Sequence, residues 1–199
     1  MEIKRAIDVF ISLIGLIVLS PVFFLIAIAI KIDSRGPVFF RQERIGLRGK
    51  PFHIHKFRSM FFDAETNGLK ITISSDHRVT RVGCFLRSYK LDELPQLIDV
   101  FFGKMSLVGP RPEVSKYVSY YPSEVKKIIF SVRPGVTDNA SIFYRSESKI
   151  LGSVADPEKT YIEEILPKKL RLYVDYVQHR SFWVDFSIIL RTLMVLVKK

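Results

Sequence analysis

The sequence has a single cysteine, Cys84, and few acidic residues. One cysteine excludes an internal disulfide framework and fits a reducing compartment. The sequence also lacks internal repeats and low-complexity linkers, so one compact domain is expected in its 199 residues. The 20 acidic residues are outnumbered by 31 basic ones, which gives a formal net charge of +11. Such an excess attracts polyanions, namely nucleic acid, anionic lipid or phosphorylated substrates.

Composition narrows this choice of partner. Aromatic residues make up 13% of the chain, and the mean hydropathy is positive at +0.16. Both values are unusual for a basic nucleic-acid binder and ordinary for a protein at a membrane surface. We therefore expect membrane lipid, and no nucleic acid, among the partners.

A long apolar run occupies residues 9–30. As a helix it would extend about 33 Å, enough to cross a hydrocarbon core of about 30 Å. A cleaved signal peptide is one interpretation, because Lys4 and Arg5 precede the run, but the run is longer than the apolar core of such peptides. Two other interpretations are an anchor that spans the membrane and a re-entrant helix.

Charges on both sides of the run bear on the last two interpretations. Basic residues precede it at Lys4 and Arg5 and recur after it from Lys31 to Lys50, so both ends are expected to stay cytosolic. Pro21 removes one helical N–H, and the preceding serine, Ser20, can bond the carbonyl left free. A sharp bend there would let the helix enter one leaflet and return. The residues alone support the spanning anchor and the re-entrant helix almost equally. In either case, this segment is a membrane element.

The chain after this run predicts a mainly helical α+β fold. Two parts are expected, a membrane helix with basic flanks at 1–35 and a compact cytosolic domain with interfacial helices at 36–199. Residues 38–40 and 51–57 flank a turn-rich stretch and predict a β-hairpin. His53 and His55 would share one face of its second strand. Without a partnering ligand nearby, solvated histidines are expected there more than a metal pair.

Helices are expected at three places after the hairpin. Residues 63–76 are polar and predict a loop, with Asp76 as the N-cap of a helix that reaches Tyr89. After a short break, a second helix is expected to end at Gly103. Residues 182–199 predict an apolar helix that either lies along the bilayer interface or packs on the domain.

The stretch at 87–97 (RSYKLDELPQL) places two adjacent carboxylates, Asp92 and Glu93, behind two cations, Arg87 and Lys90. Spacing alone favours a structural explanation, in which Asp92 is a helix N-cap. In the functional alternative, the helix N-terminus holds a phosphate. Arg87 and Lys90 would then keep Asp92 ionised as a nucleophile. Glu93, about 100° around the helix, would hold Mg²⁺.

Several motifs follow one another in a specific order along essentially the whole chain. They are Lys4-Arg5 with Asp8 ahead of Ser20-Pro21, residues 56–60 (KFRSM), Arg87-Ser88, residues 91–97 (LDELPQL), residues 105–112 (MSLVGPRP) and residues 132–137 (VRPGVT). In this order and spacing they make the chain resemble the bacterial sugar transferases, the monotopic phosphoglycosyl transferases.

The resemblance implies a reaction and its residues. Asp92 is similar to the family's nucleophile, which attacks the sugar-bearing phosphate of a UDP-sugar and releases UMP. The covalent aspartyl-phosphosugar then passes to a polyprenyl phosphate such as undecaprenyl phosphate, a ping-pong first step of surface glycan synthesis. Glu93 is similar to the ligand of Mg²⁺, or of Mn²⁺ in its place. The residues that resemble substrate contacts are Lys56, Arg58, Arg87, Arg111, Arg133 and Arg145.

The resemblance also implies a location and a membrane topology. The enzyme would be monotopic on the cytosolic face of the bacterial inner membrane. Its membrane helix would be re-entrant, bent at Ser20-Pro21 and flanked by Lys4 and Arg5.

This chain departs from the family in two places. Many members continue Gly-Trp-Ala-Gln after residues 132–137, whereas this chain has Asp138-Asn139-Ala140-Ser141. Residues 146–167 are also longer and more charged than in minimal members. Both places are where sugar or nucleotide recognition could be set, so the sugar and the role of Arg145 stay open.

Other functions fit parts of the sequence. The two helices around residue 90 resemble a helix-turn-helix, but Glu93 and Asp99 leave Gln96 as almost the only base reader. A conventional glycosyl transferase would release UDP in place of UMP. A non-catalytic membrane scaffold is opposed by the intact Asp92-Glu93 pair. The pathway and the oligomeric state, a homo-oligomer included, stay open.

Overall fold

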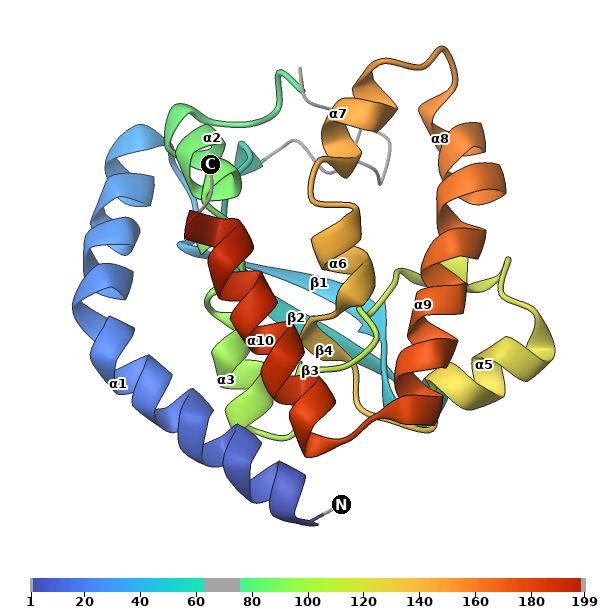
Figure 1. The fold of residues 1–199 in the computed structure, drawn as a ribbon. Helices are drawn as coiled ribbons and strands as arrows, with labels where there is room; N and C mark the ends of the chain where they lie inside the picture. Colours follow the sequence, from blue (N-terminus) through green and yellow to red (C-terminus); the bar gives the residue numbers. More distant parts are fainter. Residues whose placement is uncertain (1, 63–75, 198–199) are drawn as a thin grey trace.

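The amino-terminal apolar run lies within one long helix, α1 (Glu2–Asp33), which curves along one side of the molecule (Figure 1). The computed structural model describes residues 2–62 and 76–197, so most of the loop expected at 63–76 lies outside the described residues. The fold is mostly helical with two small sheets, in agreement with the predicted α+β class. Among the described residues, α1 is the one helix that is long and apolar enough to cross a membrane.

Helix α1 continues through Pro21. The proline cannot donate to the carbonyl of Ile17, and Ser20 Oγ donates to that oxygen instead at 2.7 Å. The expected role of Ser20 is therefore confirmed. The helix is bent and does not fold back on itself in Figure 1. Whether it enters and leaves one leaflet stays a prediction.

Polar contacts attach the start of α1 to the rest of the protein. Lys4 pairs with Asp185 near the carboxyl end of the chain. Arg5 donates to the carbonyls of Val100 and Phe101, at 2.5 and 2.7 Å. Asp8 is buried and accepts a 2.7 Å bond from Ser106. The basic residues expected to keep this end of the helix cytosolic thus also hold the helix in place.

The predicted hairpin is confirmed. Strands β1 (Phe39–Ile45) and β2 (Pro51–Phe57) pair antiparallel, with the 3₁₀ turn η1 (Leu47–Gly49) between them. Gly49 has a positive φ of 71° in this turn, where glycine avoids the strain of a side chain. Phe57, at the end of β2, packs with Ile26 and Ile30 of α1. The hairpin is therefore joined to the far end of the membrane helix.

The two helices predicted around residue 90 are present, but each begins at a later residue than predicted. Helix α2 (Arg81–Ser88) begins after Thr80, whose side chain accepts from Gly83 N, so the N-cap predicted at Asp76 is wrong. Asp76 instead bonds Arg78 two residues later, as short acidic side chains do in turns. A 3₁₀ turn, η3 (Leu91–Glu93), follows, and then α3 (Gln96–Phe101). Gly103 has a φ of 78° after α3, as expected for a helix end.

Helix α3 buries a polar face as well as apolar residues. Gln96 and Asp99 are buried, each 1% exposed. Asp99 accepts from the backbone N–H of His55 and contacts its Nδ1, both at 2.8 Å. The expectation of a solvated histidine is therefore wrong for His55, because α3 packs against β2, whereas His53 is exposed.

The glycine- and proline-rich motifs at 105–112 and 132–137 form a small parallel sheet. Strands β3 (Ser106–Val108) and β4 (Gly135–Thr137) pair in parallel. The backbones meet so closely that a Cβ on Gly135 would lie 2.1 Å from Gly109 N. Both glycines are required by this contact, which positions the residues that follow each strand.

Short helices and one long helix complete the carboxyl half. They are α4 (Ser115–Val118), α5 (Ser123–Ile129), α6 (Asn139–Phe143), α7 (Glu147–Gly152), α8 (Pro157–Thr160), the π-helical turn Tyr161–Ile165 and α9 (Leu166–His179). Their core is rich in tyrosine, including Tyr117, Tyr161 and Tyr173.

The last helix, α10 (Phe182–Val197), packs on the domain, which is one of the two roles left open for it, and a position along the bilayer interface stays a prediction. Ile188 is fully buried against Val108 and Tyr176, so one face packs on the domain. Another face exposes Phe182, Trp183 and Leu193.

Candidate active site

Asp92 lies in the turn between α2 and α3. Lys90 adopts a left-handed conformation with a φ of 57°, which ends α2 and starts η3. Asp92 is 7% exposed, and its Oδ1 is a buried oxygen without a hydrogen-bond partner among the described residues. The N-cap role weighed for Asp92 is wrong, because α3 starts after Pro95 and has no side-chain cap bond. A buried acceptor without a donor is costly, which makes this oxygen a candidate for contact with a ligand.

The pKa of Asp92 is raised. Burial is the largest cause, and the neighbouring charge of Glu93 adds to it. Lys56, Arg87 and Lys90 lower the same pKa but do not outweigh burial. Arg87 and Lys90 thus favour the ionised form, as expected, within a site that opposes it.

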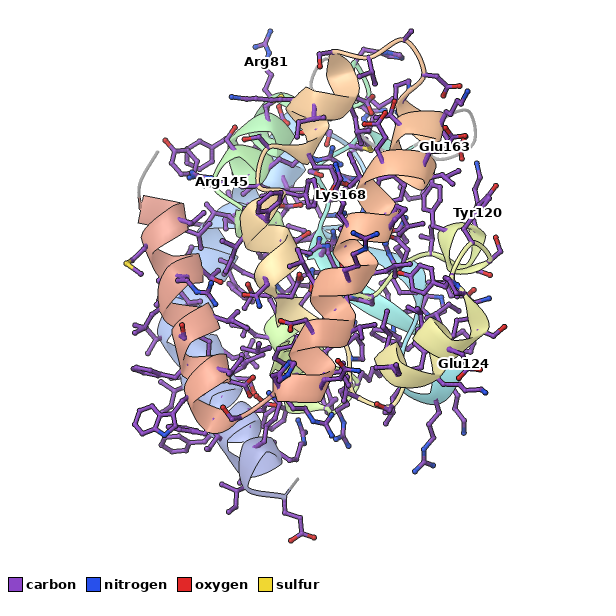
Figure 2. All side chains as sticks on the ribbon, turned by 45° about the vertical axis from the view of Figure 1, so that its right-hand side comes forward. Arg81, Tyr120, Glu124, Arg145, Glu163 and Lys168 are labelled. Carbon is purple, nitrogen blue, oxygen red and sulfur yellow. The ribbon has the colours of Figure 1, made fainter. Side chains whose placement is uncertain are left out.

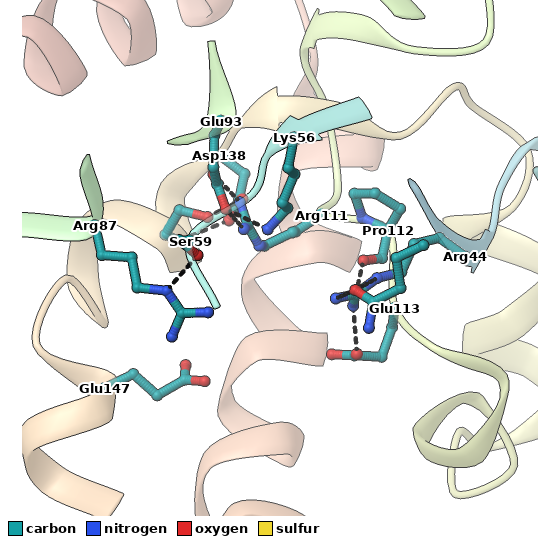
Figure 3. Close-up of polar contacts among 12 residues, drawn as sticks. Arg44, Lys56, Ser59, Arg87, Glu93, Arg111, Pro112, Glu113, Asp138 and Glu147 are labelled. Carbon is teal, nitrogen blue, oxygen red and sulfur yellow. Dashed lines mark hydrogen bonds and ion pairs between the residues drawn. The ribbon is translucent and has the colours of Figure 1, made fainter. Parts of the chain in front are cut away.

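Glu93 is held by two cations (Figure 3). Lys56 Nζ donates to Oε1 at 2.8 Å. Arg111 donates to Oε2 at 3.0 Å through NH1 and to Oε1 through NH2. Burial alone would raise the pKa of Glu93, but Arg111 and Lys56 hold it well below its usual value. Glu93 is therefore ionised at neutral pH.

Three separate parts of the chain bring these charges together. Lys56 comes from β2, Glu93 from η3, and Arg111 from the turn after β3. Arg111 is placed by the close contact of Gly109 with Gly135, described above. The Lys56–Glu93–Arg111 cluster therefore exists only when the hairpin, η3 and the parallel sheet are assembled.

Arg87 reaches the site from the last turn of α2. Its Nε donates to Ser59 Oγ at 2.8 Å. Gly83 makes this approach possible, because a Cβ there would lie 2.0 Å from Ser59 O. Burial lowers the pKa of Arg87, and Asp92 opposes that shift. Arg87 is thus a partly desolvated cation near Asp92.

Asp138 lies close to this cluster, and reasoning from sequence did not assign it a role. It is 1% exposed and caps α6, accepting from Ser141 N at 2.9 Å and from Ser141 Oγ at 2.5 Å. The negative charge of Glu93 raises the pKa of Arg111, and the negative charge of Asp138 adds to that shift. Burial raises the pKa of Asp138 itself. The spacing of Asp138 and Ser141 was an available signal, since aspartate followed three residues later by a polar residue is typical of a helix start.

Two of the other predicted substrate contacts, Arg58 and Arg133, bind backbone carbonyls. Arg58 donates to the carbonyls of Arg35 and Ser34, at 2.6 and 2.7 Å, so its guanidinium binds the carboxyl end of α1. Arg133 Nε donates to Gly103 O at 2.8 Å, beyond the far end of α3. Arg145 lies in the turn between α6 and α7 (Figure 2). The geometry favours Lys56, Arg87 and Arg111 over Arg58 and Arg133 as contacts of the reacting group, and the role of Arg145 stays a prediction.

The carboxylates fit a divalent cation only with help from a substrate. Within residues 2–62 and 76–197, no group of three or more His, Cys, Asp or Glu side chains could hold a metal ion. Glu93 Oε1 accepts from both cations, whereas Oε2 accepts from Arg111 alone among the described residues. A carboxylate oxygen can accept more than one partner, so Oε2 could still bind a cation. Mg²⁺ commonly uses one or two carboxylates and completes its shell with phosphates and water.

The chemistry available to this site is displacement at phosphorus. Asp92 offers a carboxylate oxygen that is not committed to the protein, and three cations lie around it. Such a positive, partly buried environment stabilises negative charge that develops on a phosphoryl group.

Comparison with known proteins gives one consistent result. A family model described as bacterial sugar transferase matches residues 1–199. A UDP-glucose:undecaprenyl-phosphate glucose-1-phosphate transferase from Klebsiella pneumoniae is 39% identical over 195 residues, 96% of this chain and 39% of that protein. An enzyme of the same name from Caulobacter vibrioides is 37% identical over 191 residues, 95% of this chain and 67% of the relative.

A third relative is named for a different sugar. The UDP-N-acetylgalactosamine-undecaprenyl-phosphate N-acetylgalactosaminephosphotransferase of Aeromonas hydrophila is 36% identical over 193 residues, 96% of this chain and 43% of that protein. The chain thus spans less than half the length of the Klebsiella and Aeromonas relatives, and the sugars in the printed names differ.

Proposed function

The chain belongs to the bacterial sugar transferase family, and from this premise we propose that it transfers a sugar phosphate from a UDP-sugar to a polyprenyl phosphate. The observation that carries the proposal is Asp92, a buried carboxylate whose Oδ1 has no partner, beside the Lys56–Glu93–Arg111 cluster. The names of the relatives support the two substrate classes.

The reaction proceeds in two displacements at one phosphorus atom. An Asp92 oxygen bonds to the sugar-bearing phosphorus while the bond from that phosphorus to the bridging oxygen breaks, and UMP leaves with that oxygen. A polyprenyl-phosphate oxygen then bonds to the same phosphorus, and the Asp92 carboxylate is released. The product is a polyprenyl diphosphate sugar. A covalent intermediate of this kind divides one difficult step into two easier ones.

The cations of the site suit these steps. Arg111 and Lys56 are fixed by Glu93 and so need little reorganisation when negative charge develops on the phosphate oxygens. Arg87 is oriented by Ser59. It lowers the pKa of Asp92, which favours the ionised nucleophile.

A divalent cation, Mg²⁺ or Mn²⁺, would be held by Glu93 together with the diphosphate of the substrate. When bound, it would neutralise charge that otherwise repels an anionic nucleophile. Glu93 is ionised at neutral pH and can therefore serve as this ligand without losing a proton.

We place residues 1–35 in the membrane and 36–199 on its cytosolic face, at the bacterial inner membrane. Apolar side chains of α1, such as Ile17, Val18 and Phe24, are 63–67% exposed. Water would not favour this surface, whereas a lipid interior would. Both ends of α1 contact the same domain, through Asp8 at one end and Arg58 at the other. This arrangement supports a helix whose two ends lie on one side of the membrane.

Labelling of single cysteines would test this topology. In a Cys84→Ser background, Ile3→Cys and Ile32→Cys place thiols at exposed positions near the two ends of α1. A membrane-impermeant reagent should label both positions in inverted vesicles, which expose the cytosolic face of the membrane. It should label neither position when it reaches only the opposite face. Labelling from opposite sides would show a spanning helix and contradict the re-entrant model.

The reaction is tested by its leaving group. Nanodisc-embedded protein is incubated with undecaprenyl phosphate, Mg²⁺ and a panel of UDP-sugars, and UMP is measured, with Asp92→Asn as the control. We expect UMP release that requires the metal and disappears in the variant. Release of UDP would identify a conventional glycosyl transferase. Folded protein that is inactive with every sugar would favour a scaffold.

A further inference from the structure

An open groove of about 680 Å³ lies along the first turns of α1, away from Asp92. One wall is an apolar stripe on α1, formed by Ala6, Val9, Phe10 and Leu13. Two arginines, Arg5 and Arg133, line the groove at its polar end, where Glu2 is the one acidic residue in the lining. The volume is within the range of small-molecule sites, about 300–1,000 Å³.

Both arginines bind backbone carbonyls at the end of α3, and Arg133 keeps donors that these contacts do not use. Arg5 is committed to the carbonyls of Val100 and Phe101. Arg133 binds Gly103 O through Nε, the one Arg133 nitrogen with a hydrogen bond in the described part of the chain. Capping of α3 therefore explains Arg5 fully but uses only one of the five N–H groups of Arg133. The remaining guanidinium edge is suited to a phosphate.

Charge and apolarity are arranged along the groove in the order that a lipid requires. The arginines lie at the end of α1 that carries its polar contacts, and the stripe from Ala6 to Leu13 runs about 10 Å into the apolar run. Phe10 is 64% exposed and Leu13 41% exposed, so the stripe is open to its surroundings. A headgroup at the arginines would thus continue naturally into an acyl chain along the helix.

We propose that this groove binds an anionic phospholipid, with its phosphate on Arg133 and one acyl chain along Ala6, Val9 and Leu13. The inference rests on the membrane placement of α1 proposed above, and does not depend on the reaction. The groove and Asp92 lie at opposite ends of α3, since Asp92 precedes its first residue and Gly103 follows its last turn. The bound lipid is therefore distinct from the acceptor that must reach Asp92, and it would set the depth of α1 in an anionic leaflet.

Lipid retention provides the test. The full chain is reconstituted in phosphatidylcholine nanodiscs containing a minor share of phosphatidylglycerol, and the lipids that stay bound after release into detergent are measured by native mass spectrometry. The wild type should retain phosphatidylglycerol in preference to phosphatidylcholine. Arg133→Gln should lower that preference about tenfold, as expected for a lost charge-assisted hydrogen bond.

Two further variants complete the experiment. Ala6→Trp fills the groove from an exposed helical position without changing charge or removing a hydrogen bond, so it also covers the case in which Arg133→Gln does not fold. It should reduce retention of both lipids. Lys127→Gln is the matched control, because it removes an exposed positive charge on α5, and it should behave as wild type.

Three outcomes would overturn the proposal. They are equal retention of the two phospholipids by the wild type, unchanged retention in both groove variants, and one-for-one displacement of phosphatidylglycerol by undecaprenyl phosphate, which would assign the groove to the acceptor. None of these readouts uses catalysis. A failure here is thus distinguishable from a failure of the proposed reaction.

Discussion

At the scale of single residues, the site depends on a conflict between folding and chemistry at Asp92. Burial raises the pKa of this carboxyl, so folding favours the protonated form. A nucleophile must be ionised. The nearby cations reduce the conflict without removing it, and a ligand at the unpartnered Oδ1 would reduce it further. Residues that serve function at the expense of stability are a common feature of active sites.

The first prediction concerns this conflict. A carboxyl whose pKa is higher in the folded state than in the unfolded state destabilises the fold as pH rises above its ordinary unfolded value. Asp92→Asn removes that penalty, so its melting temperature at neutral pH should exceed that of the wild type, and the difference should shrink in acid. UMP release should fall at least about a thousandfold. A variant that is both inactive and less stable at neutral pH would show that the charge of Asp92 stabilises the fold.

The second prediction is a pH dependence. Activity should decline as pH falls through the raised pKa of Asp92, while Glu93, with its lowered pKa, stays ionised over that range. Lys90 lowers the pKa of Asp92 from an exposed position with a positive φ, which asparagine tolerates. Lys90→Asn should therefore shift the acidic limb of kcat/KM to higher pH. A limb that stays in place would mean that another group controls it.

At the scale of elements, the site depends on how helix ends are held. Helix α1 ends where the Arg58 guanidinium donates hydrogen bonds to backbone carbonyls. Gly36 leaves room for that guanidinium, since a Cβ there would lie 2.0 Å from Arg58 NH1. Asp33, in the last turn of α1, accepts from Val82 N at the start of α2. The membrane helix is thereby coupled to the helix that presents Arg87.

The third prediction follows from this role of Arg58. Arg58→Met keeps the apolar stem but loses the bonds to the end of α1, and should lower the free energy of unfolding by about 3 kcal/mol. The measurement is thermal or denaturant unfolding in detergent, with kcat/KM determined per folded molecule. Arg35→Gln is the control, because it removes an exposed charge from the same turn. Unchanged stability with a raised KM for the UDP-sugar would instead make Arg58 a substrate contact.

At the scale of the whole molecule, many of the exposed apolar side chains belong to α1 and α10. Figure 2 shows α1 and α10 together along one side, with Tyr120, Glu124 and Glu163 on the other. The ion pair of Lys4 with Asp185 joins those two helices. Exposed aromatic residues of α10, Phe182 and Trp183, extend the apolar surface of α1. This asymmetry is the surface expected of a protein embedded on one face of a bilayer.

The fourth prediction uses Trp183, the one tryptophan of the sequence, which is 73% exposed. In nanodiscs its fluorescence should be quenched strongly by brominated lipid and weakly by aqueous acrylamide. The matched control is the double variant Trp183→Phe/Tyr120→Trp, which moves the fluorophore to the opposite side and should reverse both responses. Strong acrylamide quenching of the wild type would place α10 in water.

Much of the architecture follows from local sequence. The apolar run became a helix, and two segments that flank a turn-rich stretch became the hairpin. The break before Asp92 appeared where the pattern of apolar residues is interrupted. Ser20 bonds the carbonyl that Pro21 leaves free, because that partnership depends only on neighbouring residues. Helix starts were less predictable, since both Asp76 and Thr80 are good N-caps and packing against Ser59 selects Thr80.

Contacts between distant segments were decided only by the tertiary structure. Lys56, Glu93 and Arg111 belong to separate sequence motifs, and their ion pairs require β2, η3 and the turn after β3 to meet. The same applies to Arg58 and Arg133, whose guanidinium groups bind helix-end carbonyls. An arginine has the same charge in any motif. What it binds depends on which carbonyls or carboxylates the fold brings within about 3 Å, and no local pattern encodes that distance.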